Sequence, residues 1–147
     1  MFREDYLLRM IQQLVDAIAR IAGLNRRHDH DQALVEADQA WSGLLGVPIE
    51  LVHAVDSRTL AGMLREPPRI RLAAQLAREQ AHALAGKGDA VGSAARCRRA
   101  LELRLEARAL EPNDRVAEDD AAIRELADLV PVDKLAPRYQ AMLASAR

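Results

Sequence analysis

Apolar side chains recur at intervals of three and four residues along most of the chain, which places them on one face of an α-helix. Polar residues of both signs occupy the other side of the first such segment, so a helix lying on a membrane surface is not expected there. Gly23 is the predicted end of this first helix. Its apolar stripe consists of Leu7, Met10, Ile11, Leu14, Val15, Ile18, Ile21 and Ala22.

Turn and capping residues divide the remaining stripes into separate helices. A second stripe, over residues 34–45, ends at Gly46, and both Asp56 and Asp89 are natural N-caps. No alternating run rich in Val, Ile and Thr indicates a strand. We therefore predict one all-α domain over residues 1–147, with seven or eight helices. After residue 48 it has a short segment at 49–55, helices at 57–64, 69–85 and 90–110, and one containing Val116 and Leu129. Asp133 is expected to cap a last helix, which is interrupted or bent near Pro137.

Composition narrows the classes of protein that this chain can be. A net charge of −1 gives no overall attraction to nucleic acid or to an anionic membrane. No uncharged stretch approaches the ~20 residues that span a bilayer, and the start of the chain lacks the pattern of a signal peptide. Cys97 is the single cysteine, which fits a reducing compartment. We expect a cytoplasmic protein that binds neither membrane nor nucleic acid.

Charge is unevenly distributed along the chain. Bases outnumber acids over residues 58–108, and acids dominate over residues 111–128. We interpret these segments as two solvated helix faces that attract each other. Arginines at the edge of an interface steer and anchor partners, so we expect Arg99, Arg104 and Arg108 to contact a partner protein or peptide.

Residues 81–100 resemble a tetratricopeptide repeat, in which a short turn joins two antiparallel helices. The resemblance implies a divergent repeat-like fold, because the chain lacks the 34-residue period of that repeat and its closing Pro112 arrives late. It also implies that Cys97 is buried between paired helices and unreactive. The matching positions are Ala81 and Leu84, the turn GKGD at 86–89, and Ser93, Cys97 and Ala100.

Residues 5–112 as a whole resemble an uncharacterised bacterial family of helical proteins. Its members open with Asp-Tyr-Leu/Ile-x-Arg-x-Ile and later have a paired helix that ends in Leu-Leu-Gly. The resemblance implies helix hairpins of the tetratricopeptide type and implies no activity. The matching residues are Asp5, Tyr6, Leu7, Arg9 and Ile11, followed by Leu44, Leu45 and Gly46.

The sequence His28-Asp29-His30-Asp31 alternates two side-chain types that bind transition metals. Two histidines that are two residues apart point in opposite directions on a helix, so they chelate one ion only in an extended segment. Asp29 followed by Gln32 is instead the pattern of a capping box. We therefore expect Asp29 to cap the second helix through its carboxylate, and we predict no metal site here.

Two Glu-x-x-His units, Glu50 with His53 and Glu79 with His82, leave a metalloprotein as the alternative. Ferritin-like di-iron bundles use two such units on separate helices, because the spacing places carboxylate and imidazole on one helical face. Glu36 and Glu102 are then available as the remaining ligands. A segment as short as 49–55 and a polar surrounding of His82 argue against this interpretation.

No other pattern indicates catalysis. Ser57 and Ser93 have no base nearby in the sequence, and GKGD lacks the Ser or Thr and the preceding strand of a phosphate-binding loop. We therefore predict a protein that is not an enzyme and carries no cofactor. Its expected function is to bind peptides or partner helices in apolar grooves between helix pairs.

The first helix is also a predicted self-association surface. Its apolar stripe is wider than one neighbouring helix covers, and a symmetric homodimer is the commonest way to cover the excess. The alternative is that the C-terminal helices fold back over this face. The predicted contact residues follow the seam of a coiled coil and are Leu7, Ile11, Leu14, Ile18 and Ile21.

Overall fold

The computed structural model describes residues 2–113 and 117–146, and over these residues it is helical, with eight α-helices and no strand. The predicted all-α class and the number of helices are confirmed. The helices are α1 (Phe2–Arg26), α2 (His30–Gln39), α3 (Ile49–Ala54), α4 (Ser57–Leu64), α5 (Pro67–Gly86), α6 (Ala90–Leu110), α7 (Ala117–Leu129) and α8 (Pro137–Ala146). A π-helical turn, Ala40–Leu44, extends α2, and a 3-10 turn, Val132–Lys134, precedes α8.

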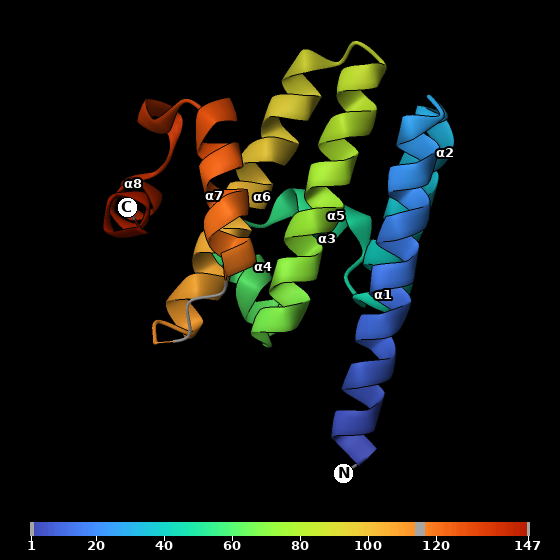
Figure 1. Ribbon diagram of the computed structural model, residues 1–147, viewed down its shortest axis with the longest axis horizontal. Helices are drawn as coiled ribbons and strands as arrows, with labels where there is room; N and C mark the ends of the chain where they lie inside the picture. Colours follow the sequence, from blue (N-terminus) through green and yellow to red (C-terminus); the bar gives the residue numbers. More distant parts are fainter. Residues whose placement is uncertain (1, 114–116, 147) are drawn as a thin grey trace.

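The long helices α5 and α6 pack along each other at the centre of the molecule (Figure 1). Helices α1 and α2 lie on one side of this pair, and α7 and α8 lie on the other (Figure 1). The N-terminal turns of α1 project beyond the other helices (Figure 1). None of the described helices combines the length and the apolar character that crossing a membrane requires.

Two apolar clusters lie on the two sides of α5 and α6. The first joins α1, α2, α4 and α5 around Trp41, which is fully buried and donates from Nε1 to Oε1 of Gln80 at 3.2 Å. The second joins α5 and α6 to α7 and α8, and it includes Cys97 and Tyr139. Cys97 is therefore buried as predicted, and burial raises the pKa of its thiol.

The first helix continues through Gly23 and ends at Arg26, so the prediction that Gly23 ends it is wrong. The chain turns at His28, which takes the left-handed conformation with φ 62°. The amide of Asp29 then donates to the carbonyl of Leu24 at 2.8 Å. This is the hydrogen bond of a Schellman C-cap, and histidine is among the residues that tolerate it.

The turn between α5 and α6 uses the same geometry. Gly88 has φ 84°, and the amide of Asp89 donates to the carbonyl of Leu84 at 2.9 Å. The carboxylate of Asp89 also accepts from the amide of Gly92 at 2.8 Å, which confirms it as an N-cap. The carboxylate of Asp56 caps α4 in the same way.

Asp29 stands at the N-cap position of α2, but its carboxylate accepts no hydrogen bond from the first turn. The predicted capping box is therefore wrong in its contacts, although the helix begins where it was expected. Asp133 likewise lies in the 3-10 turn and does not cap α8. The helical segment is interrupted before Pro137, as one of the two alternatives predicted, and Pro137 begins α8, in the first turn, where a proline ring fits. Val116, expected in the helix before it, lies outside the described residues.

Candidate functional site

A cavity of about 590 Å³ opens between the α3–α4 connection, the middle of α6 and the start of α8. Its lining contains five arginines and two carboxylates, so it is strongly positive although the whole chain is nearly neutral. The lining residues are His53, Val55, Asp56, Ser57, Arg58, Ala95, Arg96, Arg98, Arg99, Glu102, Ala136, Arg138 and Tyr139.

Arg99 forms the fixed inner wall of this cavity. Its Nη2 donates to the carbonyls of Val52 at 2.8 Å and Val55 at 2.7 Å, at the end of α3. Its Nη1 donates to Oγ of Ser57 at 3.0 Å, and Ser57 in turn donates to Oε1 of Glu102 at 2.6 Å. Burial lowers the pKa of Arg99. These bonds hold the guanidinium in place without an ion pair.

Ser57 thus has a carboxylate partner that its sequence neighbours did not reveal. A serine beside a carboxylate can be a nucleophile and base, but Ser57 is only 2 % exposed. Its oxygen already accepts from Arg99 while its proton points to Glu102. The three groups therefore form a closed hydrogen-bonded link between α4 and α6.

Arg96 lies against the ring of His53, with Nη2 at 2.9 Å from Nδ1 and 3.2 Å from Nε2. A guanidinium only donates, so His53 presents an unprotonated nitrogen. Burial and the charge of Arg96 lower the pKa of His53. Burial and the charge of Arg99 lower the pKa of Arg96. Among the described residues, Nε and Nη1 of Arg96 have no acceptor.

Three further arginines stand at the rim. Arg58 and Arg98 are exposed, and neither has a hydrogen bond or an ion pair with any described residue. Arg138 binds the carboxylate of Glu106 through two nitrogens, at 3.1 and 2.7 Å. Tyr139 donates to the same carboxylate at 2.8 Å. Burial opposes ionisation of Glu106, but the bonds from Arg138 and Tyr139 outweigh it and lower its pKa.

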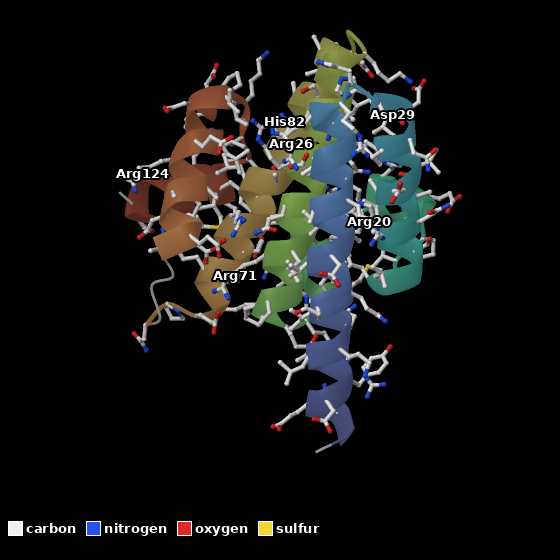
Figure 2. All side chains as sticks on the ribbon, turned by 45° about the vertical axis from the view of Figure 1, so that its right-hand side comes forward. Arg20, Arg26, Asp29, Arg71, His82 and Arg124 are labelled. Atoms are coloured by element: carbon white, nitrogen blue, oxygen red, sulfur yellow. The ribbon has the colours of Figure 1, made fainter. Side chains whose placement is uncertain are left out.

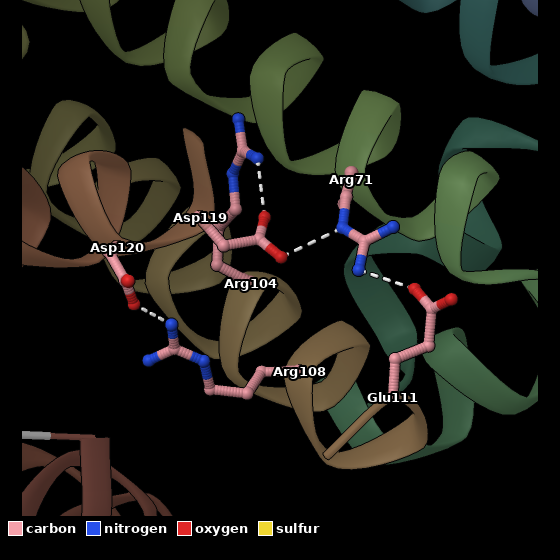
Figure 3. A network of polar contacts seen from close by, with 6 residues as sticks. All are labelled: Arg71, Arg104, Arg108, Glu111, Asp119 and Asp120. Atoms are coloured by element: carbon pink, nitrogen blue, oxygen red, sulfur yellow. Dashed lines mark hydrogen bonds and ion pairs between the residues drawn. The ribbon is translucent and has the colours of Figure 1, made fainter. Parts of the chain in front are cut away.

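Arg104, predicted to contact a partner, lies in the interior and is 5 % exposed. Its Nη1 donates to Oδ1 of Asp119 at 2.9 Å, and Nε of Arg71 donates to Oδ2 of the same residue at 2.8 Å (Figure 3). Asp119 is itself 1 % exposed. One carboxylate of α7 therefore binds arginines of α5 and α6, and Arg104 has almost no surface to offer a partner.

The other members of this network extend it along α6. Arg108 pairs with Asp120, and Nη2 of Arg71 donates to Oε1 of Glu111 at 2.5 Å (Figure 3). The predicted attraction between the basic and the acidic segment is thus present. The prediction that both faces are solvated is wrong where Asp119 meets Arg104, because both residues are buried.

Helical periodicity explains which arginines of α6 line the cavity and which of them face α7. Arg96 and Arg99 are three apart and share one face of α6, toward α3 and α4. Arg104 and Arg108 are four apart and share another face, toward α7. Of the predicted contact residues, only Arg99 lines the cavity. No sequence pattern predicted that Arg58 and Arg138, from distant segments, would also line the cavity.

The two Glu-x-x-His units lie in different places. His53 lines the arginine cavity, whereas Glu79 and His82 line a cavity of about 420 Å³ beside the end of α1. Figure 2 shows His82 near Arg26 there. Nowhere in residues 2–113 and 117–146 do three His, Cys, Asp or Glu side chains stand where they could hold one metal ion. The structure does not bring the proposed di-iron ligands together.

Residues 28–31 do not form a metal site; their side chains link the turn after α1 to the end of α5. Nδ1 of His30 donates to Oδ1 of Asn25 at 2.9 Å, and Nδ2 of Asn25 donates to the carbonyl and to Oε1 of Glu79, both at 3.0 Å. The ring of His30 rests on Gly86, where an added Cβ would lie 2.2 Å from Nε2. Asp31 pairs with Lys87 at 2.5 Å.

The predicted self-association residues are mostly inside the chain. Leu14, Ile18 and Ile21 are buried in the cluster with α2 and α5, and Leu7 and Ile11 are partly buried against it. Helices α7 and α8 pack mainly on α6, and α7 reaches only a cavity that Ile18 also lines. Self-association stays a prediction, and the exposed apolar side chains left for it on α1 are Tyr6, Leu8 and Val15.

No family model matches the chain, and neither a curated protein nor a solved structure matches it.

Proposed function

We propose that this chain is a non-catalytic interaction module, built from divergent tetratricopeptide-like helix hairpins, that binds an acidic segment of a partner protein. The support is the set of arginines around one cavity that lack carboxylate partners: Arg58, Arg96, Arg98 and Arg99. Holding like charges close together costs folding free energy. A bound anion offsets that cost, and long-range attraction also speeds its encounter with the cavity.

An acidic peptide suits this cavity better than a nucleic acid. Single strands bind through stacking of bases on aromatic rings. Tyr139 is the aromatic residue of the lining, and it is 6 % exposed with its hydroxyl bonded to Glu106. Its ring is therefore not available as a stacking platform.

The test is fluorescence anisotropy with a labelled Asp- and Glu-rich peptide and with a matched peptide of Asn and Gln. We expect salt-sensitive binding of the acidic peptide only, and loss of that binding in Arg96→Gln and Arg98→Gln. Arg9→Gln removes an exposed charge of α1 outside the cavity and is the matched control. Equal binding of both peptides, or equal effects of Arg9→Gln and Arg98→Gln, would contradict the proposal.

A further inference from the structure

We infer that the anionic group held in the arginine cavity is a phosphoryl group on a side chain of the partner, so that the module recognises a phosphorylated segment. This inference rests on the proposed function and names the ligand chemistry of the same site. Three observations support it: the arginines enter the cavity from different helices, the lining has a net positive charge, and Arg96 and Arg99 are held in place by hydrogen bonds.

The donors surround the cavity from several directions. Arg58 comes from α4, and Arg96 and Arg99 come from α6. Arg138 comes from α8 and keeps Nη1 for a ligand, since its other two nitrogens bind Glu106. A carboxylate accepts through two oxygens that lie in one plane, which suits a single bidentate arginine. A phosphoryl group has three terminal acceptor oxygens arranged in space. Arginines on three helices therefore match its geometry better than that of a carboxylate.

The charge of the lining matches a dianion. Five guanidinium groups face the carboxylates of Asp56 and Glu102, which leaves three positive charges in excess. Arg138 is already bonded to Glu106 behind the lining, which leaves two charges in excess within the lining. Asp38 and Asp89, outside the lining, attract Arg96 but form no ion pair with it. A phosphorylated serine or threonine carries about −1.5 to −2 at pH 7. A glutamate side chain supplies half of that charge.

Two of the arginines are held in place before any ligand arrives. Arg99 is fixed by two carbonyls and Ser57, and Arg96 is held at the ring of His53. Pre-positioned groups lose less conformational entropy on binding. Arg96 also keeps Nε and Nη1 without an acceptor among the described residues. These two nitrogens lie on different edges of the guanidinium, so each offers a donor to a separate phosphate oxygen.

The size of the cavity indicates that the phosphoryl group arrives attached to a larger molecule. A volume of about 590 Å³ is in the range of pockets for drug-sized ligands. Its rim residues Arg58 and Arg98 are exposed and reach the residues on either side of a modified side chain. A free phosphate ion leaves most of this volume unfilled.

The experiment measures binding of the full chain to four fluorescein-labelled probes at one ionic strength. Three are the same neutral peptide with phosphoserine, glutamate or serine at its centre, and the fourth is a single-stranded oligonucleotide. Unlabelled inorganic phosphate is added as a competitor. We expect the phosphoserine peptide to bind about tenfold or more tightly than the glutamate peptide, since one additional charge-assisted hydrogen bond is enough to change the affinity by that factor.

Variants assign that preference to the cavity. Arg98→Gln and Arg58→Gln alter exposed side chains that have no hydrogen bond or ion pair with a described residue, so both variants should fold. Each should weaken binding of the phosphoserine peptide about tenfold. Arg9→Gln should leave its affinity unchanged. Circular dichroism and the melting temperature of each variant verify that the fold is retained.

The outcomes separate this inference from the proposed function. Glutamate and phosphoserine peptides of equal affinity would overturn the inference and leave acidic-segment binding in place. Inorganic phosphate that binds as tightly as the phosphopeptide would support the phosphoryl site but overturn the peptide ligand. An oligonucleotide that binds most tightly would overturn both, as would a chain that binds none of the probes.

Discussion

At the scale of single residues, side chains that suggest chemistry in the sequence serve as structural links. Asn25 accepts from His30 and donates to Glu79, so three polar residues tie the end of α1 to α5. The histidine that suggested a metal ligand is placed by this chain of hydrogen bonds and by contact with Gly86. The residues that form this link are close together in space but far apart in the sequence, so no short sequence motif predicts it.

Gly86→Ala is therefore expected to destabilise the protein. Alanine in place of glycine normally stabilises a helix by up to about 1 kcal/mol. Gly86 is the last residue of α5, so this gain is smaller there than in a helix interior. The new Cβ would also displace the His30 ring and break its bond to Asn25, which costs about 1 kcal/mol. Urea unfolding should show a net loss of stability in Gly86→Ala, whereas the same substitution in a His30→Ala background should cause no further loss, because the bond is already absent there.

Gly62→Ala is the matched control, because nothing lies within 4 Å of a Cβ at Gly62 in α4. It should raise the unfolding free energy by up to about 1 kcal/mol. Stabilisation of the same size at Gly86 would show that His30 does not occupy the position described.

His53 gives a second prediction at this scale. Burial and Arg96 lower its pKa in the folded state, so below about pH 6.5 the unfolded chain binds more protons than the folded one. The stability contribution is present above that pH and is lost as the pH falls through the lowered pKa. Unfolding free energy measured from pH 7.5 to 5.5 should therefore fall less in His53→Gln than in the unchanged protein. An equal fall of unfolding free energy with pH in both proteins would contradict this prediction.

At the scale of elements, the aspartates at helix starts show that a sequence pattern can predict where a helix begins without predicting the hydrogen bonds of its capping residue. Three aspartates stand at N-cap positions, but only Asp56 and Asp89 accept a bond from the first turn. Backbone conformation does not distinguish them, because Asp29 with ψ 64° and Asp89 with ψ 82° both lie outside the extended region. Hydrophobic spacing located these helices, but it does not specify where the carboxylate of the capping residue points.

Asp89→Ala should consequently cost about 1 kcal/mol of unfolding free energy, the usual value for a lost N-cap. Asp29→Ala should cost clearly less, since no capping bond is lost. Denaturant titrations of the two single variants make the comparison. Equal losses would mean that Asp29 caps α2 in solution.

The arginines of the candidate site come partly from one helix face, which spacing predicts, and partly from distant helices, which it does not. Helical spacing assigns Arg96 and Arg99 to one face of α6, and this was predictable in principle. The contribution of Arg58 and Arg138 depends on how α4 and α8 pack against α6, which no periodicity specifies. The same limit applies to Arg104, because its burial follows from the position of Asp119 on α7.

At the scale of the whole molecule, buried ion pairs hold α7 to the central helices. Asp119 connects α7 to α5 through Arg71 and to α6 through Arg104 (Figure 3). Apolar contacts of Ile123 and Leu126 accompany these bonds. The orientation of α7 therefore depends on the face that carries Asp119, Ile123 and Leu126.

Asp119→Ala is expected to destabilise the protein by about 3–5 kcal/mol, because it leaves buried guanidinium charge without its counterion. Removal of one partner of a buried pair costs far more than the pair itself contributes, since the desolvation of the remaining charge is no longer compensated. Urea unfolding measures the total loss, and amide hydrogen exchange should show the largest loss of protection in α7. Asp120→Ala, which removes the partly exposed partner of Arg108, should cost about 1 kcal/mol or less. Similar losses for the two variants would show that water reaches Asp119 and that apolar packing alone holds α7 in place.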